Sequence, residues 1–398
     1  MKVAGVPSEF NPFHRGHEYI LRAIRARLGE DTAVVCAMSG NFAQRGECAL
    51  YRKHARAEAA VRCGADLVLE LPLPWALSSA EGFGEGMAQL LDATGVVTHL
   101  CFGSESGDVG ALGEAAEILL RPEMDPLIRS ALQSGISYAA ARQQAAERLS
   151  PGAGELLTRP NDILGIEYIK ALKKTNSAMA PMAVPRVGVQ HDGTGDGVFL
   201  SAKELRRRCA AGEDVFPLLP ESAAAVFRRE AEAGRGPVGV AALETALLSR
   251  LRMLPPEAFD ALPDASEGLG RRLYAAAREG GSLDTVLTLA KTKRYAAARL
   301  RRMLLCACLG VRAGDRDGGV PYLKVLAISL RGRALLREMR GTARLPVLTK
   351  PAAVTALSER ARRIFSLEAE AGDLYALGYA NVEERRAGAD WREAPFVG

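Results

Sequence analysis

The chain has 398 residues, of which 48% are hydrophobic and 25% are charged, and this length predicts two or three globular domains. No apolar run is long enough to span a membrane, and no signal-peptide pattern precedes the first apolar run, so a membrane or secreted protein is not expected. The seven cysteines form no C-x-x-C pair and no metal spacing with histidine. We therefore expect no structural zinc and a cytoplasmic location.

The net charge of +5 is unevenly distributed along the chain. Residues 201–398 carry 33 basic and 24 acidic side chains, and 291–350 alone carry 15 basic and 3 acidic ones. A local excess of this size is typical of a surface that binds a phosphate backbone. The second half of the chain is therefore expected to contact nucleic acid.

Strand and helix patterns alternate over the first two hundred residues. The expected elements are, in chain order, strands at 2–7, 32–38, 66–71 and 96–102, helices between them at 17–28, 53–62 and 80–92, a capped helix after Asn161-Asp162, a strand near 184–190 and a helix from Ser201. Continuous apolar strands alternating with helices predict an α/β fold with a Rossmann-like, doubly wound parallel sheet.

Beyond about residue 215 the strand patterns nearly vanish, and Ala, Leu, Glu and Arg dominate. Breaks fall at Pro255-Pro256 and Gly280-Gly281. We therefore expect an α/β domain over 1–214 and a mainly α-helical, basic domain over 215–398.

The most informative motif is His14-Arg15-Gly16-His17, which lies where the first strand gives way to the first helix. A helix N-terminus there offers unpaired N–H groups and a favourable dipole to an anion. Residues three apart share a helix face, so His14 and His17 are predicted to face one group, a phosphate. A capping or surface role for the histidines is the alternative. The position of the motif, at the turn where α/β sheets bind nucleotides, favours the phosphate site.

Three further segments are predicted to converge on this site. Gly103, at the carboxyl end of a strand, would let adenine or ribose approach the backbone, unless it is a simple turn glycine. Asn161 can cap its helix or offer an amide to a ligand, and capping is favoured for it alone. Ser201 at a helix start can donate to phosphate, and Arg206 can neutralise its charge. Arg186 adds a cation near a strand end, although a lone arginine is usually a surface group.

Taken together, these residues resemble the nucleotidylyltransferase superfamily that carries H-x-G-H. Five longer strings narrow the resemblance to the tRNA(Met) cytidine acetate ligase family, and they begin at Glu9 (EFNPFH), Met38 (MSGNFAQRGE), Gly64 (GADLVLELP), Phe102 (FGSE) and Lys291 (KTKRY). The similarity runs from the first strand to beyond residue 340. The departures are minor: Arg15 between the histidines, Cys48 after Gly46-Glu47, and Ala296 after Tyr295.

The resemblance implies ATP-dependent activation of acetate, followed by acetyl transfer to the wobble cytidine of elongator tRNA(Met). It implies ATP as a substrate and no obligate protein partner. Mg²⁺ is compatible with this reaction, although no carboxylate cluster in the sequence indicates a metal site. His14, His17, Ser201 and Arg206 would act in catalysis. The implied ATP contacts are Pro7, Ser8, Glu9, Phe10, Asn11, Pro12, Phe13, His14, Arg15, Gly16, His17, Glu18, Tyr19, Ile20, Gly103, Asn161 and Arg186.

Two segments are candidates for contact with acetate or tRNA. Gln44 and Arg45 follow the second strand and are expected to read acetate or the target base, with an ordered structural loop as an equal alternative. A second group is expected to contact the tRNA backbone, in place of a merely solvated helix face: Lys291, Lys293, Arg294 and Arg299.

Two other functions remain open from the residues alone. A small-molecule adenylyltransferase acting on a cofactor precursor would explain H-x-G-H equally well but leaves the basic half unused. A non-catalytic RNA-binding protein with a vestigial nucleotide pocket is the other, and the presence of His14, His17, Ser201 and Arg206 argues against it.

Overall fold

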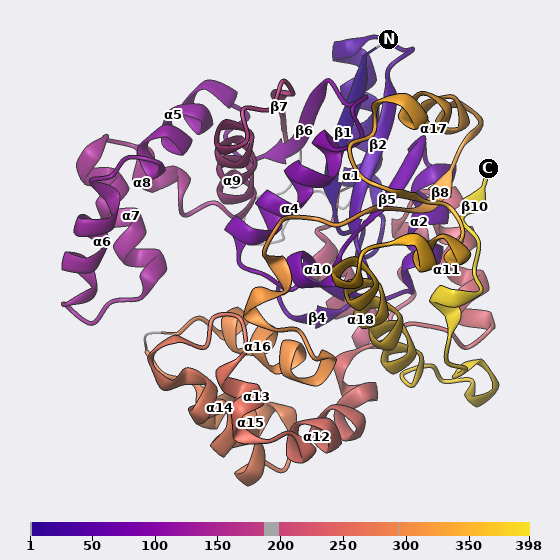
Figure 1. The fold of residues 1–398 in the computed structure, drawn as a ribbon. Helices are drawn as coiled ribbons and strands as arrows, with labels where there is room; N and C mark the ends of the chain where they lie inside the picture. The colour runs from indigo at the N-terminus through magenta and orange to yellow at the C-terminus, as the bar shows by residue number, and fades with distance from the viewer. Residues whose placement is uncertain (1, 187–198, 294) are drawn as a thin grey trace.

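The computed structural model describes residues 2–186, 199–293 and 295–398 (Figure 1). Within these ranges an eight-stranded sheet has the order β10-β8-β5-β2-β1-β6-β7, and β9 pairs with β8 off this path. The strands, including the separate hairpin β3–β4, are β1 (Val3–Ser8), β2 (Ala33–Ser39), β3 (Phe42–Ala43), β4 (Glu47–Cys48), β5 (Leu67–Leu71), β6 (His99–Ser104), β7 (Ala180–Pro185), β8 (Leu323–Ile328), β9 (Val347–Leu348) and β10 (Phe396–Val397).

Helices surround this sheet and form two additional lobes (Figure 1). Their bounds are α1 (Arg15–Leu28), α2 (Lys53–Arg62), α3 (Leu73–Ala76), α4 (Ala80–Asp92), α5 (Val109–Leu119), α6 (Met124–Leu132), α7 (Tyr138–Leu149), α8 (Ala153–Leu156), α9 (Pro160–Lys174), α10 (Ala202–Ala210), α11 (Glu221–Glu232), α12 (Glu244–Met253), α13 (Pro256–Asp260), α14 (Leu269–Glu279), α15 (Leu283–Ala290), α16 (Ala297–Leu309), α17 (Leu330–Thr342) and α18 (Glu359–Ala376).

The sheet is buried on both faces, and the strand residues alternate between the two cores. Along β2, Val35 and Ala37 belong to the core that holds α4 and α9, while Cys36 and Met38 belong to the core that holds α1, α2 and α11. β1, β2, β5, β6 and β7 run parallel to their neighbours in this group. The α/β fold with a doubly wound sheet is therefore confirmed.

The residues after 214 are mainly helical, as expected, and they also contribute strands to the sheet. β8 runs antiparallel to β5, and β10 forms the edge of the sheet beside β8. Periodicity cannot distinguish a six-residue apolar run such as Leu323–Ile328 from a buried helix segment, and β9 and β10 are only two residues long. The strand expected near 184–190 lies earlier, at Ala180–Pro185, and 187–190 fall outside the described residues.

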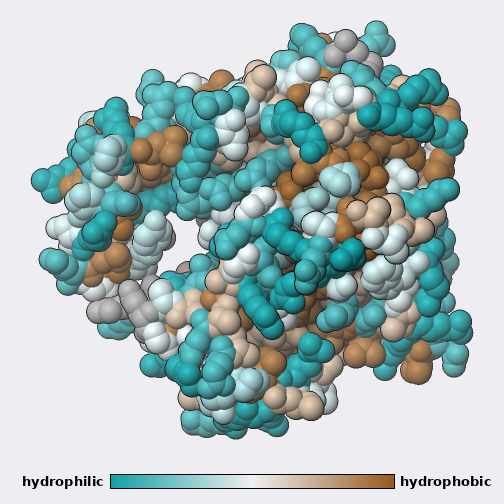
Figure 2. Space-filling model, viewed as in Figure 1, coloured by the Kyte–Doolittle hydropathy of each residue, from teal (hydrophilic) through white to brown (hydrophobic). Residues whose placement is uncertain are grey.

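Two helical lobes project from the sheet. α12–α16 have their own hydrophobic core, which Phe42 and Leu77 join from the N-terminal half. The second lobe, α5–α8, is an insertion between β6 and α9 that the sequence reading did not anticipate. Figure 2 shows a mainly hydrophilic surface that is hollowed between this insertion and the rest of the molecule.

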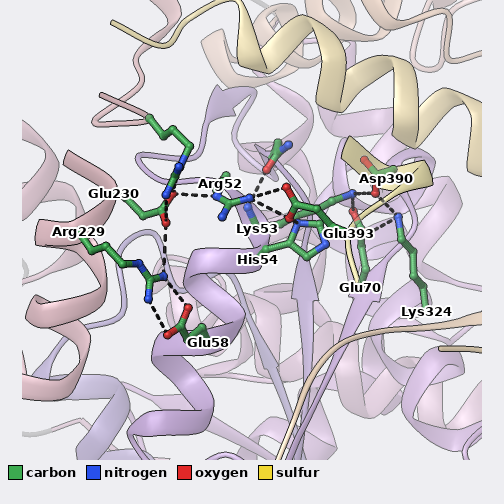
Figure 3. Close-up of polar contacts among 12 residues, drawn as sticks. Arg52, Lys53, His54, Glu58, Glu70, Arg229, Glu230, Lys324, Asp390 and Glu393 are labelled. Atoms are coloured by element: carbon green, nitrogen blue, oxygen red, sulfur yellow. Dashed lines mark hydrogen bonds and ion pairs between the residues drawn. The ribbon is translucent and has the colours of Figure 1, made fainter. Parts of the chain in front are cut away.

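Buried ion pairs fasten the last described segment to the N-terminal half (Figure 3). Lys53, at the start of α2, contacts Glu70 of β5 at 2.8 Å and also pairs with Asp390. Lys324 of β8 contacts Glu70 at 2.9 Å and pairs with Asp390 as well. All four side chains are buried. Figure 3 also shows a neighbouring set of ion pairs, which joins Arg52, His54, Glu393, Glu230, Arg229 and Glu58.

Candidate active site

The site lies at the edge of the sheet where β1, β2, β6 and β7 have their carboxyl ends, at Ser8, Ser39, Ser104 and Pro185. Crevices at this edge are where open α/β sheets bind ligands. α1 begins at Arg15, and His14 is its N-cap. The motif that the sequence singled out therefore lies at the predicted strand-to-helix turn.

His14 and His17 form a reciprocal capping box at the start of α1. The Gly16 N–H donates to Nδ1 of His14 at 3.0 Å, and the His14 N–H donates to Nδ1 of His17 at 3.2 Å. The rings stack with centroids 3.8 Å apart. A Cβ on Gly16 would lie 2.8 Å from Cε1 of His14, so this glycine makes room for the imidazole rather than for a ligand.

Both imidazoles are held neutral. Burial, together with the charges of Arg186 and Arg206, lowers the pKa of His14 to about 3. Burial also lowers the pKa of His17 well below its ordinary value, together with His14 and Arg186. Because Nδ1 accepts a hydrogen bond in each ring, we assign the proton to Nε2. The pair therefore presents two neutral N–H donors.

The loop before α1 packs its aromatic side chains against this pair. Phe10 has a φ of 46°, an uncommon left-handed conformation for a bulky residue, and its ring is buried. The rings of Phe10 and Phe13 lie 4.9 and 5.5 Å from that of His17. The side chain of Asn11 accepts a hydrogen bond from the Leu50 N–H at 2.7 Å. The ring contacts with His17 and the hydrogen bond from Leu50 thus fix the conformation of the loop.

The two predicted arginines reach the same edge of the sheet. Arg206 of α10 donates to the Asn11 carbonyl at 2.8 Å and pairs with Glu47 of β4 at 3.0 Å. Arg186 follows β7. A Cβ added to Gly103 would lie 3.7 Å from Cγ of Arg186 and 3.2 Å from Cδ1 of Ile20. The missing side chain of Gly103 therefore lets Ile20 and Arg186 approach the backbone of β6 closely.

Two other predicted residues lie at the starts of helices. Ser201 is the N-cap of α10, and its Oγ accepts from the Glu204 N–H at 3.2 Å. Asn161 is not an N-cap, in contrast to the favoured expectation, because α9 begins at Pro160. The carboxylate of Glu105 occupies the start of α9, where it accepts from the Asn161 and Asp162 N–H groups and from the Asn161 side chain.

The loop after β2 joins this edge of the sheet to the helical lobe. The side chain of Gln44 donates to the Ser78 carbonyl at 3.0 Å, and Arg301 of α16 donates to the Arg45 carbonyl at 3.1 Å. Gly46 has a φ of +74°, and a Cβ there would lie 2.6 Å from the Arg302 nitrogen. Only glycine fits this contact with α16. The Arg45 side chain is exposed.

The predicted basic segment lies on the helical lobe. Lys291 and Lys293 are exposed. Arg299 is fastened within the lobe, because it donates to the Asp264 carbonyl at 2.6 Å and to Ser266 Oγ at 2.9 Å. Arg294 lies outside the described residues.

Sequence reasoning missed Arg56, which holds the site from below. It is fully buried in α2, and its guanidinium donates to the carbonyls of Glu9, Ser39, Gly40 and Tyr51. The ends of β1 and β2 are thereby tied together. An arginine among the charged residues of α2 looks solvent-exposed in the sequence, and nothing in the pattern indicates its burial.

Among 2–186, 199–293 and 295–398, no group of three or more His, Cys, Asp or Glu side chains is arranged to hold a metal ion. Within the same ranges, no helix is both long and apolar enough to cross a bilayer.

The fold and the histidine pair define a nucleotidyl transferase: the family model described as HIGH Nucleotidyl Transferase matches residues 1–390. Two relatives carry the name tRNA(Met) cytidine acetate ligase. The one from Fervidobacterium nodosum is 35% identical and covers 98% of each chain. The one from Syntrophotalea carbinolica is 38% identical and covers 100% of this chain and 99% of its own. The chain belongs to the tRNA(Met) cytidine acetate ligase family.

A solved structure agrees with this assignment. The crystal structure of Thermotoga maritima TmcAL bound with alpha-thio ATP superposes with a TM-score of 0.92 at 34% identity, covering 100% of this chain and 99% of that one. The apo form of the same protein gives a TM-score of 0.93. The similarity in fold therefore extends over the whole chain, including the part that contains the antiparallel strand β8, and not only over the nucleotide-binding half.

Proposed function

We propose that the protein activates acetate with ATP and transfers the acetyl group to the wobble cytidine of elongator tRNA(Met), releasing pyrophosphate and AMP. The observation that carries the proposal is the stacked pair of neutral histidines at the start of α1, with Arg186 and Arg206 as the charges that act on it. Relatives of nearly equal length bear the name of this activity, and one neighbour was solved with an ATP analogue.

In the first step an acetate oxygen attacks the α-phosphate and pyrophosphate leaves. Catalysis of this kind consists mainly of positioning and of stabilising phosphate charge. We assign the phosphates to Nε2–H of His14 and His17 and to the N-terminus of α1. Arg206 would neutralise charge on them, and Ser201 would donate its hydroxyl proton.

The adenosine part of ATP is assigned to the opposite side of this phosphate site. We assign the ring or the ribose to the backbone of Gly103, where no side chain of that residue intervenes and where Arg186 and Ile20 lie beside it. The side-chain oxygen of Asn161 is directed by its amide hydrogen bond to Glu105, at 2.6 Å, and is assigned to the same ligand. The remaining contacts with ATP are assigned to residues 7–8 and 10–20.

In the second step the cytosine amine attacks the acetyl-adenylate. We assign Gln44 and Arg45 to the acetate or target-base side of the site, and Lys291, Lys293, Arg294 and Arg299 to the tRNA backbone. The helical residues after 214 would then carry the tRNA, and those before it the chemistry. The reaction needs no protein partner, and its tRNA substrate places it in the cytoplasm.

One assay tests the proposed function: purified protein is incubated with ATP, radiolabelled acetate and a tRNA(Met) transcript. The expected result is label in the tRNA that depends on ATP and is lost when uridine replaces the wobble cytidine. No label in the tRNA at any Mg²⁺ concentration would overturn the proposal.

A further inference from the structure

Glu9 is fixed at the carboxyl end of β1. Arg56 holds its carbonyl oxygen, and the Gln44 N–H donates to its carboxylate at 2.6 Å. Gln44 follows β2, whereas Gly103 belongs to β6, and β1 lies between these two strands. The carboxylate therefore points to the β2 side of the site, away from the space assigned to adenosine.

Among the residues that the structure describes, no cation contacts the Glu9 carboxylate. It forms no salt bridge with any residue in the described ranges, and its second oxygen accepts no hydrogen bond from them. Removing a carboxylate from water is costly unless a cation or hydrogen-bond donors compensate for it. Burial raises the pKa of this carboxyl above its ordinary value, against the opposing effects of Gln44 and Arg206. A carboxylate left in this state at the carboxyl edge of a parallel sheet is a candidate for proton transfer.

The negative charge of Glu9 determines which of the three substrates (ATP, acetate or the target cytidine) it can bind. ATP and acetate are both anions, which a carboxylate repels. The cytosine amine is a hydrogen-bond donor, and carboxylates are the side chains that accept from it. We infer, on the basis of the proposed function, that Glu9 binds the exocyclic amine of the target cytidine and takes its proton during acetyl transfer.

The step balances without a further reactant. The amine nitrogen attacks the carbonyl carbon of the acetyl-adenylate, so a C–N bond forms. The bond from that carbon to the phosphate oxygen breaks, and AMP leaves with the electron pair. The proton lost by the nitrogen passes to the free oxygen of Glu9 and then to solvent, which restores the carboxylate. Glu9 thereby changes from a contact of ATP, as the resemblance implies, to the catalytic residue of the second step.

The test separates the two steps in the variant Glu9→Gln, which keeps an oxygen for the Gln44 N–H but cannot take a proton. Adenylation is measured as acetate-dependent exchange of radiolabelled pyrophosphate into ATP, with and without a transcript in which uridine replaces the wobble cytidine. Transfer is measured in a single turnover with tRNA(Met). Glu30→Gln, an exposed carboxylate between α1 and β2, is the matched control.

We expect Glu9→Gln to exchange pyrophosphate at nearly the wild-type rate and to transfer acetyl groups about 100-fold more slowly or worse. Glu9→Asp should recover part of the transfer rate. The wild-type transfer rate should rise with pH and level off once Glu9 is ionised, and this rise should be absent in Glu9→Gln. The charged and titratable groups that act on Glu9, namely Arg206, Arg56, Glu47 and Tyr168, are unchanged in both proteins.

Two outcomes would overturn the inference. Wild-type transfer by Glu9→Gln would show that no proton passes to this residue, and an equal loss of exchange and transfer would make it an ATP contact or a structural residue. If the wild-type protein itself exchanges pyrophosphate but labels no tRNA, the proposed function fails instead, independently of Glu9.

Discussion

His14 and His17 stack with ring centroids 3.8 Å apart, and each accepts a backbone N–H through Nδ1. Two stacked imidazolium rings would repel each other, and burial lowers the pKa of both rings, so the pair is neutral. Their shared function is then to donate two hydrogen bonds, while the positive charge is supplied by arginines.

Replacing His14 by Asn tests this donor role. An Asn side chain still caps α1 by accepting from the Gly16 N–H, but the Nε2–H donor is lost. We expect acetate-dependent pyrophosphate exchange to fall by about 100- to 1000-fold, the range for removal of one positioned donor. His99→Asn, at the start of β6 and hence at the other edge of the sheet, should exchange at the wild-type rate. An unchanged rate in His14→Asn would remove His14 from the phosphate site.

The neutral histidines also predict how stability depends on pH. Because the folded pKa of His14 is about 3 and that of His17 is also lowered, the unfolded chain binds more protons below pH 6.5. The free energy of unfolding should therefore fall as the pH decreases from about 6.5, by at most about 1.4 kcal/mol per pH unit for each ring. Urea denaturation between pH 7 and 5 measures this slope. A wild-type slope no steeper than that of His14→Asn would contradict the assignment.

Lys324 should contribute strongly to stability. It is buried against Glu70, Asp390 and Glu368, and the attraction of these carboxylates holds its pKa well above the ordinary value despite burial. Lys324→Met would leave carboxylates buried without their partner, at a cost of about 3–5 kcal/mol in the free energy of unfolding. Chemical denaturation compares it with Lys350→Met, an exposed lysine that should cost almost nothing. A loss below 1 kcal/mol would mean that Lys53 alone neutralises the cluster.

Gly46 tests the contact between the loop after β2 and α16. Gly46→Ala introduces a Cβ 2.6 Å from the Arg302 nitrogen in a left-handed backbone conformation, so the loop must move. We expect a stability loss of about 1–3 kcal/mol and weaker acetyl transfer. Gly341→Ala adds a Cβ into open space and serves as the control. Equal melting temperatures and transfer rates of the two variants would show that the loop does not depend on this contact.

The basic segment predicts a salt-dependent loss of tRNA binding. Lys291→Ala combined with Lys293→Ala removes two exposed charges, so the slope of log Kd against log salt should decrease by about 1 for each lysine. Filter binding at several salt concentrations measures the slope. Lys2→Ala, before β1 at the far edge of the sheet, should leave it unchanged. If the double variant retains the wild-type slope, the tRNA lies elsewhere.

Much of the sheet could be predicted, because β1, β2, β5 and β6 are continuous apolar runs in alternation with amphipathic helices. The strand β8 could not, since it reads as a short apolar run in a helical context and its partner β5 lies more than 250 residues earlier. Pairing over such a separation leaves no local pattern.

Some residues of the candidate site could likewise be predicted from the sequence, and others could not. His14, His17 and Arg206 carry signals in their spacing, and the structure brings them to one edge of the sheet. The partners of Asn161 could not be predicted, because the carboxylate that occupies the start of α9 comes from Glu105, 56 residues earlier. Arg56 looks like an ordinary surface cation in the sequence, and its burial follows only from the four carbonyl oxygens that surround it.

The buried contact between Lys53 and Asp390 has a consequence for synthesis of the protein. During translation, Lys53 leaves the ribosome long before Asp390, so until then its ammonium group has only Glu70, 17 residues later, as a partner from this cluster of carboxylates. The edge strand β10 is added later still. Native packing beneath the ends of β1 and β2 is thus a late event, and contacts of such long range are associated with slow folding. The emerging polypeptide would have no completed catalytic edge with which to bind nucleotide before its final segment docks.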